Sequence, residues 1–159
     1  MLFRSMALLR DRDREAIQKE FQKLVNPVKL LFFTQGLDCE TCPITKEILC
    51  EITALDSRVT LQELNRVLEK DTVEKFGIKR IPAIVPVRVE TSEENGETKT
   101  SERDYGIRFY GVPSGYEFAS LLGDILDISR GDSGLMPETR EALKHLTQPI
   151  HLQVFTTPT

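Results

Sequence analysis

The sequence has no block rich in lysine or arginine, and its overall charge is negative. It holds 21 lysines and arginines against 25 aspartates and glutamates, which is a formal net charge of −4 at pH 7. A protein that binds nucleic acid neutralises phosphates with a basic face. This charge balance therefore argues against a nucleic-acid partner.

Long apolar runs are missing as well. Arg4 and Arg10 interrupt the apolar residues at the amino end. Neither the apolar core of a signal peptide nor a span of about 20 apolar residues fits there. We therefore expect a cytoplasmic location and no membrane partner. The 159 residues, 40% of them hydrophobic and 29% charged, have the balance of one soluble globular domain with room for an appendage.

Cysteine and histidine are scarce. Only Cys39, Cys42, Cys50, His145 and His151 occur, too few for a scaffold of structural disulfides in a chain without an export signal. A structural zinc needs four ligands, usually two closely spaced Cys/His pairs, and only Cys39 and Cys42 form such a pair. The ligand count disfavours a metal, and we expect none. Cys50 is interpreted as a structural or interface cysteine.

Apolar periodicity and turn residues predict an alternation of helices and strands. A βαβ half is followed by a ββα half, which is typical of a mixed central sheet with helices on both faces. The polar stretch with the pair Asn95-Gly96 predicts an antiparallel hairpin. Helices are expected over 11–24, 43–55, 69–76, a segment after Ser114 and 137–146, and strands over 28–34, 59–64, 83–90, 104–110 and 150–155.

The stretch Gly36 to Thr45, GLDCETCPIT, contains a CxxC motif between a predicted strand and a predicted helix. A thiol reacts as its thiolate, and free N–H groups at a helix N-terminus favour that anion. The motif places Cys39 where the helix starts and Cys42 within disulfide distance. Cys39 would then attack a substrate disulfide, and Cys42 would resolve the mixed disulfide.

A second feature is Lys79-Arg80-Ile81-Pro82-Ala83, which places a proline at the mouth of a predicted strand. An X–Pro bond is cis at modest cost, and a cis turn there would bring backbone polar groups towards a neighbouring loop. Taken alone, Pro82 is an ordinary proline at a strand start. Its position after the CxxC motif, within the βαβ–ββα order, makes it specific.

Taken together, these segments resemble the thioredoxin/glutaredoxin superfamily, and more closely the protein disulfide oxidoreductases that join two thioredoxin units. The resemblance implies a thioredoxin-like α/β fold with a mixed four-stranded sheet and an additional N-terminal helix. It covers nearly the whole chain and is carried by FQKLVNPVKLLFF, CETC, EKFGIKRIPAIV, DYGIRFYGVPSGYEFASLLGDILDIS, LMPETREAL and VFTTPT.

The resemblance also implies a function. The activity would be thiol–disulfide exchange on protein disulfides and dithiols, with no cofactor besides the redox-active disulfide Cys39–Cys42. The backbone of Ile81, next to a cis Pro82, would pair with an extended substrate segment. A flavoprotein of the thioredoxin-reductase kind is a candidate electron donor.

The resemblance predicts a division of the chain as well. Residues 1–130 would form a thioredoxin/glutaredoxin-like unit with its N-terminal helix. Residues 131–159 would form a linker, a helix and the first strand of a truncated second unit. An unpaired final strand over 150–155 would be an exposed edge, through which two copies could form a homodimer.

Residues around the cysteines are expected to tune the redox potential. Asp38 and Glu40 place negative charge beside Cys39, which disfavours its thiolate, while Arg80 on a facing loop offsets them. Thr41, between the cysteines, belongs to the same tuning set. We therefore expect a site on the reducing side. The alternative is a binding module with an inert CxxC that only docks onto a second unit or a flavoprotein.

Overall fold

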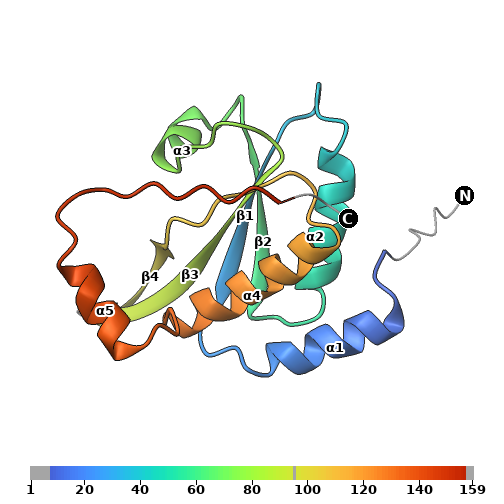
Figure 1. Ribbon diagram of the computed structural model, residues 1–159. Helices are drawn as coiled ribbons and strands as arrows, with labels where there is room; N and C mark the ends of the chain where they lie inside the picture. Colours follow the sequence, from blue (N-terminus) through green and yellow to red (C-terminus); the bar gives the residue numbers. More distant parts are fainter. Residues whose placement is uncertain (1–7, 95, 157–159) are drawn as a thin grey trace, which may run out of the picture.

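The computed structural model describes residues 8–94 and 96–156 (Figure 1). Helices and strands alternate in the order that the sequence predicts for the thioredoxin-like unit. None of the described helices has both the length and the apolar composition needed to cross a membrane. The elements are α1 (Asp11–Phe21), β1 (Val28–Thr34), α2 (Cys42–Thr53), β2 (Val59–Asn65), α3 (Lys70–Lys75), β3 (Ala83–Glu94), β4 (Glu97–Asp104), β5 (Phe109–Tyr110), α4 (Tyr116–Arg130) and α5 (Pro137–Lys144).

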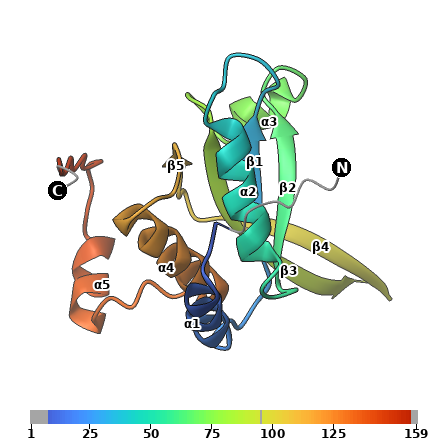
Figure 2. The same cartoon turned by 90° about the vertical axis from the view of Figure 1, so that its right-hand side faces the viewer.

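The strands form one mixed sheet in the order β2-β1-β3-β4, with β5 also beside β3. β1 pairs with β2 in parallel and with β3 antiparallel. β3 is long enough to pair with β5 near its start and with β4 further on. Figure 2 shows α1, α2 and α4 on one face of this sheet, with α5 further out. The predicted mixed sheet flanked by helices is confirmed. It has five described strands and not the predicted four, because β4 and β5 pair separately with the long strand β3.

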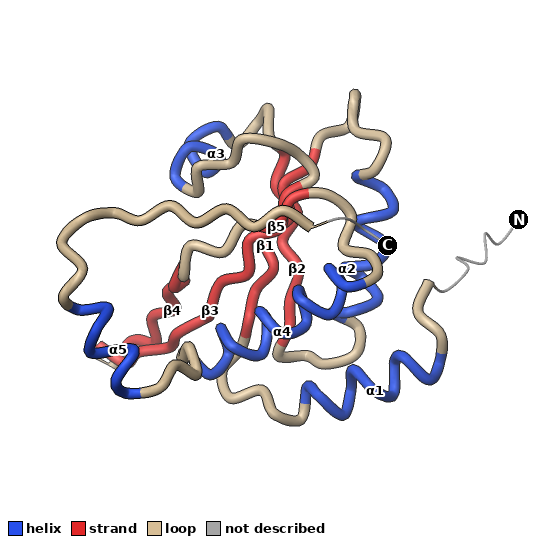
Figure 3. Tube along the Cα trace, in the orientation of Figure 1, coloured by secondary structure: helices blue, strands red, loops and turns tan. Residues whose placement is uncertain are grey.

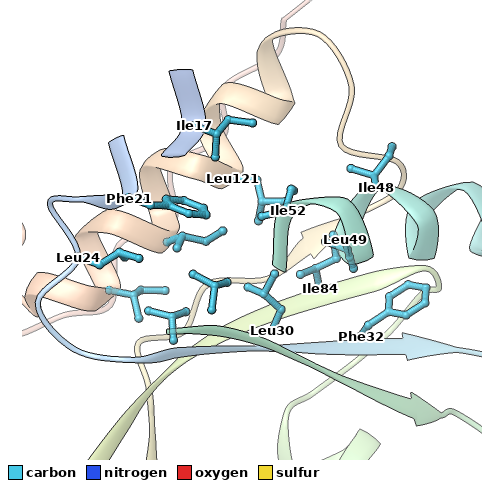
Figure 4. Packing of buried hydrophobic residues seen from close by; sticks show 14 of the residues in the cluster. Ile17, Phe21, Leu24, Leu30, Phe32, Ile48, Leu49, Ile52, Ile84 and Leu121 are labelled. Atoms are coloured by element: carbon cyan, nitrogen blue, oxygen red, sulfur yellow. The ribbon is translucent and has the colours of Figure 1, made fainter. Parts of the chain in front are cut away.

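The central strand β1 is buried on both faces, which explains its uninterrupted apolar run. Leu30 and Phe32 pack with residues of α1, α2 and α4 in one cluster. Leu31 and Phe33 pack in a second cluster, which includes Phe76, the residue after α3. Figure 4 shows the first cluster, in which side chains from three helices meet β1 and β3. Because each fully buried Leu, Ile or Phe contributes roughly 1.5–3 kcal/mol, these two clusters hold the unit together.

The predicted hairpin exists, but its arms differ from the prediction. The first arm continues to Glu94, and β4 starts at Glu97, so most of the segment expected as a polar loop forms a two-stranded ribbon (Figure 3). Exposed strands that pair with each other need no apolar face. Their sequences therefore show no apolar alternation from which the strands could be predicted. The second predicted strand, 104–110, is interrupted at Gly106, whose φ is +83°. Asn95 of the predicted turn pair lies outside the described residues.

The predicted strand over 150–155 is wrong. These residues are described, yet they form no strand. All residues from Arg130 to Thr156 are exposed, and Figure 2 shows α5 and the chain after it lying away from the sheet. An alternating sequence becomes a strand only where another strand supplies hydrogen-bond partners. Within the described part of the chain, this segment has none.

Candidate active site

The two cysteines of the CxxC motif form a disulfide at the start of α2. Cys39 and Cys42 are bonded, with their Cα atoms 5.4 Å apart. Cys42 is the first residue of α2, and its N–H donates to the Cys39 carbonyl oxygen at 3.3 Å. Asp38, with φ +58°, turns the chain into the motif, a conformation that aspartate tolerates better than most residues. The disulfide therefore lies at a helix N-terminus, where backbone N–H groups favour a thiolate.

The two cysteines differ in exposure to solvent. Cys39 is partly exposed, whereas Cys42 is only 4% exposed. Behind Cys42, the buried Thr45 hydroxyl donates to the Thr41 carbonyl oxygen at 2.8 Å, which fixes the first turn of α2. Cys39 is therefore the more accessible of the two cysteines to an outside molecule.

The proline loop lies at the same end of the sheet. The Ile81–Pro82 peptide bond is cis, as the sequence suggested. Ala83, the next residue, pairs with Phe33 near the end of β1, directly before the CxxC loop leaves the sheet. The Pro82 carbonyl oxygen accepts the N–H of Gly111 at 3.0 Å. Ile81 and Cys39 both pack at the margin of the same apolar cluster, so the structure brings the two predicted features together.

The residues predicted to tune the cysteines are all at the surface. Asp38, Glu40, Thr41 and Arg80 are exposed. Within the described residues, none of the three charged ones has an oppositely charged group within 4.0 Å. Their tuning role stays a prediction.

One turn further along α2, Lys46 is paired. Its ammonium lies 2.5 Å from a Glu63 carboxylate oxygen on β2. The hydrogen bond to Glu63 raises the pKa of Lys46 above its ordinary value. This pair ties the helix that carries the disulfide to the edge strand of the sheet, and it leaves neither charge available to the cysteines.

The other candidate ligands lie elsewhere. Cys50 is exposed on α2, beside Arg14 and Glu51. His145 and His151 belong to the exposed C-terminal region. Within residues 8–94 and 96–156, no group of three or more His, Cys, Asp or Glu side chains could hold a metal ion.

Two loops at this end of the sheet were missed by the sequence analysis. The loop after β2 carries Val67 and Leu68, both exposed, and it shares a hollow with Leu37 and Asp38 of the CxxC loop. The loop after β5 carries Gly111, which is bonded to Pro82. Two adjacent apolar residues, one position beyond a strand that ends in asparagine, were a signal for the first loop. The second had no local signal, because the contact depends on strand pairing.

The mixed sheet joins a βαβ half and a ββα half. A CxxC disulfide lies where the helix of the βαβ half begins, and a cis-proline lies at the same end of the sheet. Together these features define a thioredoxin fold. The disulfide at this position is the arrangement of a thiol–disulfide oxidoreductase. Known proteins bear out the fold. No protein-family model matches the sequence, and no curated protein matches it. Solved structures, however, match it well.

A protein disulfide oxidoreductase from Aeropyrum pernix K1 matches with a TM-score of 0.69 at 24% identity, over 86% of this chain and 55% of that chain. The NTD_N/C domain of the alkylhydroperoxide reductase AhpF from Enterococcus faecalis matches with a TM-score of 0.69 at 25% identity, over 84% of this chain and 58% of that chain. A C503A mutant of AhpF from the same organism gives a TM-score of 0.70 at 25% identity, over 87% and 61%.

The match with the Aeropyrum enzyme establishes the fold. This chain spans only 55% to 61% of the three chains that it matches. The AhpF neighbours and the observed Cys39–Cys42 pair support a thiol–disulfide redox function. The AhpF structures are also consistent with a redox role inside a larger protein.

Proposed function

We propose that this chain catalyses thiol–disulfide exchange with protein disulfides, with Cys39 as the nucleophile and Cys42 as the resolving thiol. The observation that carries the proposal is the difference in burial across the disulfide. The cysteine that must meet an outside molecule is the partly exposed one, Cys39. Its partner Cys42 is buried at the start of α2, where it is shielded from substrate and close to Cys39.

In the reducing direction the reaction needs no group other than this dithiol. The Cys39 thiolate attacks one sulfur of the substrate disulfide, which forms a mixed disulfide and releases one substrate thiolate. The Cys42 thiolate then attacks the Cys39 sulfur, which forms the observed Cys39–Cys42 disulfide and releases the second substrate thiolate. Two electrons pass from the dithiol to the substrate, and the released thiolates take up protons.

An outside dithiol reduces the enzyme again. We propose that a flavoprotein of the thioredoxin-reductase kind supplies it, in the cytoplasm, where thiols are kept reduced. The main chain of Ile81 would pair with an extended substrate segment. This is supported by the packing of Ile81 and Cys39 against one apolar cluster.

We place the site on the reducing side of the range. Exposed Asp38 and Glu40 flank Cys39, and negative charge disfavours a neighbouring thiolate. Arg80 on the proline loop, with Thr41, tempers this effect. Equilibration with glutathione redox buffers measures the potential. We expect a value nearer to that of thioredoxin, about −270 mV, than to that of strongly oxidising enzymes, about −120 mV; a value near −120 mV would contradict this placement.

Activity is tested with insulin and bis(2-hydroxyethyl) disulfide, using dithiothreitol as the reductant. We expect turnover by the wild type, near-complete loss in Cys39→Ser, and unchanged turnover in Cys50→Ser, which removes a thiol from the same helix outside the site. Equal, negligible turnover by the wild type and Cys39→Ser would contradict the proposal.

One observation favours a second candidate function, a docking module of a larger redox protein. Large apolar side chains are exposed over the C-terminal region, and the matched structures belong to longer chains. In this proposal, residues 131–159 are the linker and first elements of a second unit, and their apolar side chains pack against the rest of it or against a second copy. These side chains are Leu135, Met136, Leu143, Leu146, Ile150, Leu152, Val154 and Phe155.

Light scattering separates these arrangements. A homodimer through residues 150–155 predicts twice the monomer mass, reduced to the monomer mass by Leu152→Lys. A wild-type monomer would contradict the homodimer. If the chain is only a docking module, the Cys39→Ser variant should bind the rest of the redox protein as well as the wild type does. Disulfide turnover should then be negligible in both the wild type and Cys39→Ser.

A further inference from the structure

A buried hydroxyl lies in the first turn of the helix that carries the disulfide. Thr45 is the third residue after Cys42 in α2, and it is 0% exposed. In the part of the chain that the structure describes, only Thr34 and Ser129 are polar residues of comparable burial. Burying a hydroxyl costs free energy unless the hydroxyl is hydrogen-bonded. The partner of the Thr45 hydroxyl is therefore informative.

That partner is the carbonyl oxygen of Thr41, which lies between the two cysteines. The Thr45 hydroxyl donates to this oxygen at 2.8 Å, and the Thr45 N–H donates to the same oxygen at 3.1 Å. The Thr41 carbonyl and the Cys42 N–H belong to one planar peptide group. By holding the carbonyl with two donors, Thr45 fixes the orientation of the N–H group next to the disulfide.

The Cys42 N–H is the donor that a thiolate on Cys39 can use. In the disulfide form it donates to the Cys39 carbonyl oxygen at 3.3 Å, which is longer than the usual range of about 2.7–3.2 Å. The second residue of α2, Pro43, has no N–H. In the described structure the Thr41 side chain makes no capping hydrogen bond either. Because the first turn offers few donors, the Cys42 N–H carries much of the stabilisation of an anion there.

A hydrogen bond to a carbonyl oxygen also strengthens the N–H of the same peptide group as a donor. Linked hydrogen bonds polarise one another, by about 10–30% per bond. A stronger donor stabilises a thiolate more than a neutral thiol, because hydrogen bonds to ionised acceptors are the stronger ones. The Thr45 hydroxyl therefore favours the thiolate by two routes, the orientation and the polarisation of one peptide group.

We infer that Thr45 is a positioning residue for the exchange reaction, which acts through the Thr41–Cys42 peptide group to stabilise the thiolate of Cys39. This inference rests on the proposed function and adds to it a residue outside the CxxC motif. Without the hydroxyl, the thiolate should be less stable. Cys39 should then react more slowly near neutral pH, and the dithiol should be more strongly reducing.

Three variants of Thr45 test the role of the hydroxyl. Thr45→Val and Thr45→Ala remove it, and Thr45→Ser keeps it. The reaction of reduced Cys39 with iodoacetamide is followed across pH in a Cys50→Ser background, with peptide mass spectrometry to separate Cys39 from Cys42. We expect the pH midpoint to rise by about half a unit without the hydroxyl, which is about a threefold loss of thiolate. In Thr45→Ser it should match the wild type.

Charged side chains of three loops also influence a thiolate on Cys39, and all four proteins keep them. They lie on the CxxC loop, the loop after β2 and the proline loop: Asp38, Glu40, Arg66, Glu69, Lys79 and Arg80. Their contribution is the same in the wild type and in each variant of Thr45. A difference between the midpoints therefore reports the hydroxyl.

Equilibration with glutathione redox buffer at pH 7 is the second readout. A less stable thiolate shifts the equilibrium toward the Cys39–Cys42 disulfide and reduced glutathione. Thr45→Val and Thr45→Ala should therefore favour the disulfide about two- to threefold more than the wild type does. Thr45→Ser should restore the wild-type equilibrium.

The matched control is Thr53→Val, near the other end of the same helix. The Thr53 hydroxyl donates to the Leu49 carbonyl oxygen at 3.0 Å, which is the same bond to the residue four positions earlier. Thr53 is the last residue of α2, far along the helix from Cys39. Its loss should leave both the pH midpoint and the glutathione equilibrium at their wild-type values.

The outcomes separate the role of Thr45 from the exchange reaction. Unchanged midpoints and equilibria in Thr45→Val and Thr45→Ala would overturn the inference, and so would equal shifts in Thr45→Ser or Thr53→Val. Neither readout uses a protein substrate. Negligible insulin turnover by the wild type would instead contradict the exchange reaction, whatever the Thr45 variants show.

Discussion

The two ends of the central sheet are built differently. At the end where β1 and β2 stop, the partly exposed disulfide and the exposed apolar residues Leu37, Val67 and Leu68 face solvent. Asp38, Glu40 and Arg80 there have no ion-pair partner among the described residues. At the end where β1 and β2 start, polar groups are paired with one another. There the buried Ser129 hydroxyl bonds the chain before β1, and Arg58 donates to the carbonyl oxygens of Phe21 and Leu24.

This difference indicates that function and stability are separated along the strands. Apolar side chains and charges that are left without partners do not stabilise the folded unit, and they remain available to bind another molecule. Buried polar groups that are fully paired hold α1, α4 and the sheet in one arrangement. Changes at the disulfide end should therefore alter reaction rates, and changes at the other end should alter stability.

The largest effect is expected at the disulfide end, from Cys42→Ser. In this variant the mixed disulfide on Cys39 can be resolved only by a thiol from solution. An intramolecular thiol reacts at a high effective concentration, so its loss should lower insulin turnover about a thousandfold. Intact mass spectrometry should detect the trapped adduct on Cys39. Cys50→Ser should show neither effect. Rapid turnover in Cys42→Ser would remove the role assigned to Cys42.

At the other end, Ser129→Ala should destabilise the fold without changing the reaction. The hydroxyl accepts the N–H groups of Val25 at 2.9 Å and Asn26 at 3.0 Å, and it donates to the Asn26 carbonyl oxygen at 2.6 Å. Because the site is fully buried, the loss should cost about 2–4 kcal/mol, measured by urea unfolding. Insulin turnover at 25 °C should match the wild type.

The matched control for this loss is Ser120→Ala on the same helix. The exposed Ser120 hydroxyl donates to the Tyr116 carbonyl oxygen and, among the described residues, to no other group. Its stability should change by about 0.5 kcal/mol or less. Equal stability losses at the two serines would show that burial and pairing at Ser129 do not matter.

A smaller loss of stability is expected from Gly131→Ala, at the end of α4. Gly131 has φ +69°, and a Cβ atom there would overlap the Arg88 guanidinium and lie 2.9 Å from the Tyr105 hydroxyl oxygen. Gly134→Ala is the control, because Gly134 has nearly the same φ, +68°, but open space around it. We expect Gly131→Ala to lower the free energy of unfolding by about 1–2 kcal/mol and Gly134→Ala to lower it less, as measured by thermal unfolding. A larger loss at Gly134 would show that crowding by Arg88 and Tyr105 is not the cause.

The smallest effect depends on pH. The hydrogen bond from Arg58 lowers the pKa of Asp56 below its ordinary value of 3.8, so the folded state favours the carboxylate. Its contribution to stability is present above pH 3.8 and is lost as the pH falls through the lower folded value. Asp56→Asn should lower the Tm by about 2–4 °C at pH 7. The difference should shrink below about pH 4; a constant difference would show that the charge is not its cause.

Much of the fold was predictable because it depends on local patterns. The apolar run Val28 to Thr34 is found as β1 with the predicted bounds. The ribbon from Thr91 to Arg103 was missed, because its strands face solvent on both sides and carry no apolar alternation. The strand expected over 150–155 failed for the opposite reason, since it has the alternation but no described partner.

The candidate site shows the same division. The CxxC spacing and the position of Pro82 indicated a redox loop and a facing proline, and both lie at one end of the sheet. The hollow shared by Leu37 and Leu68 was not predictable, because these residues are brought together by the pairing of β1 with β2.

The sequence by itself determined the strands and helices whose apolar residues repeat with a regular period, and the spacing that lets Cys39 and Cys42 form a disulfide. The tertiary structure alone decided how far each cysteine is exposed, which loops surround the disulfide, and which apolar residues stay exposed. The physical reason is that periodicity and spacing are local properties of the chain. Burial and strand pairing depend on residues far apart in the sequence, so they are defined only once the sheet has formed.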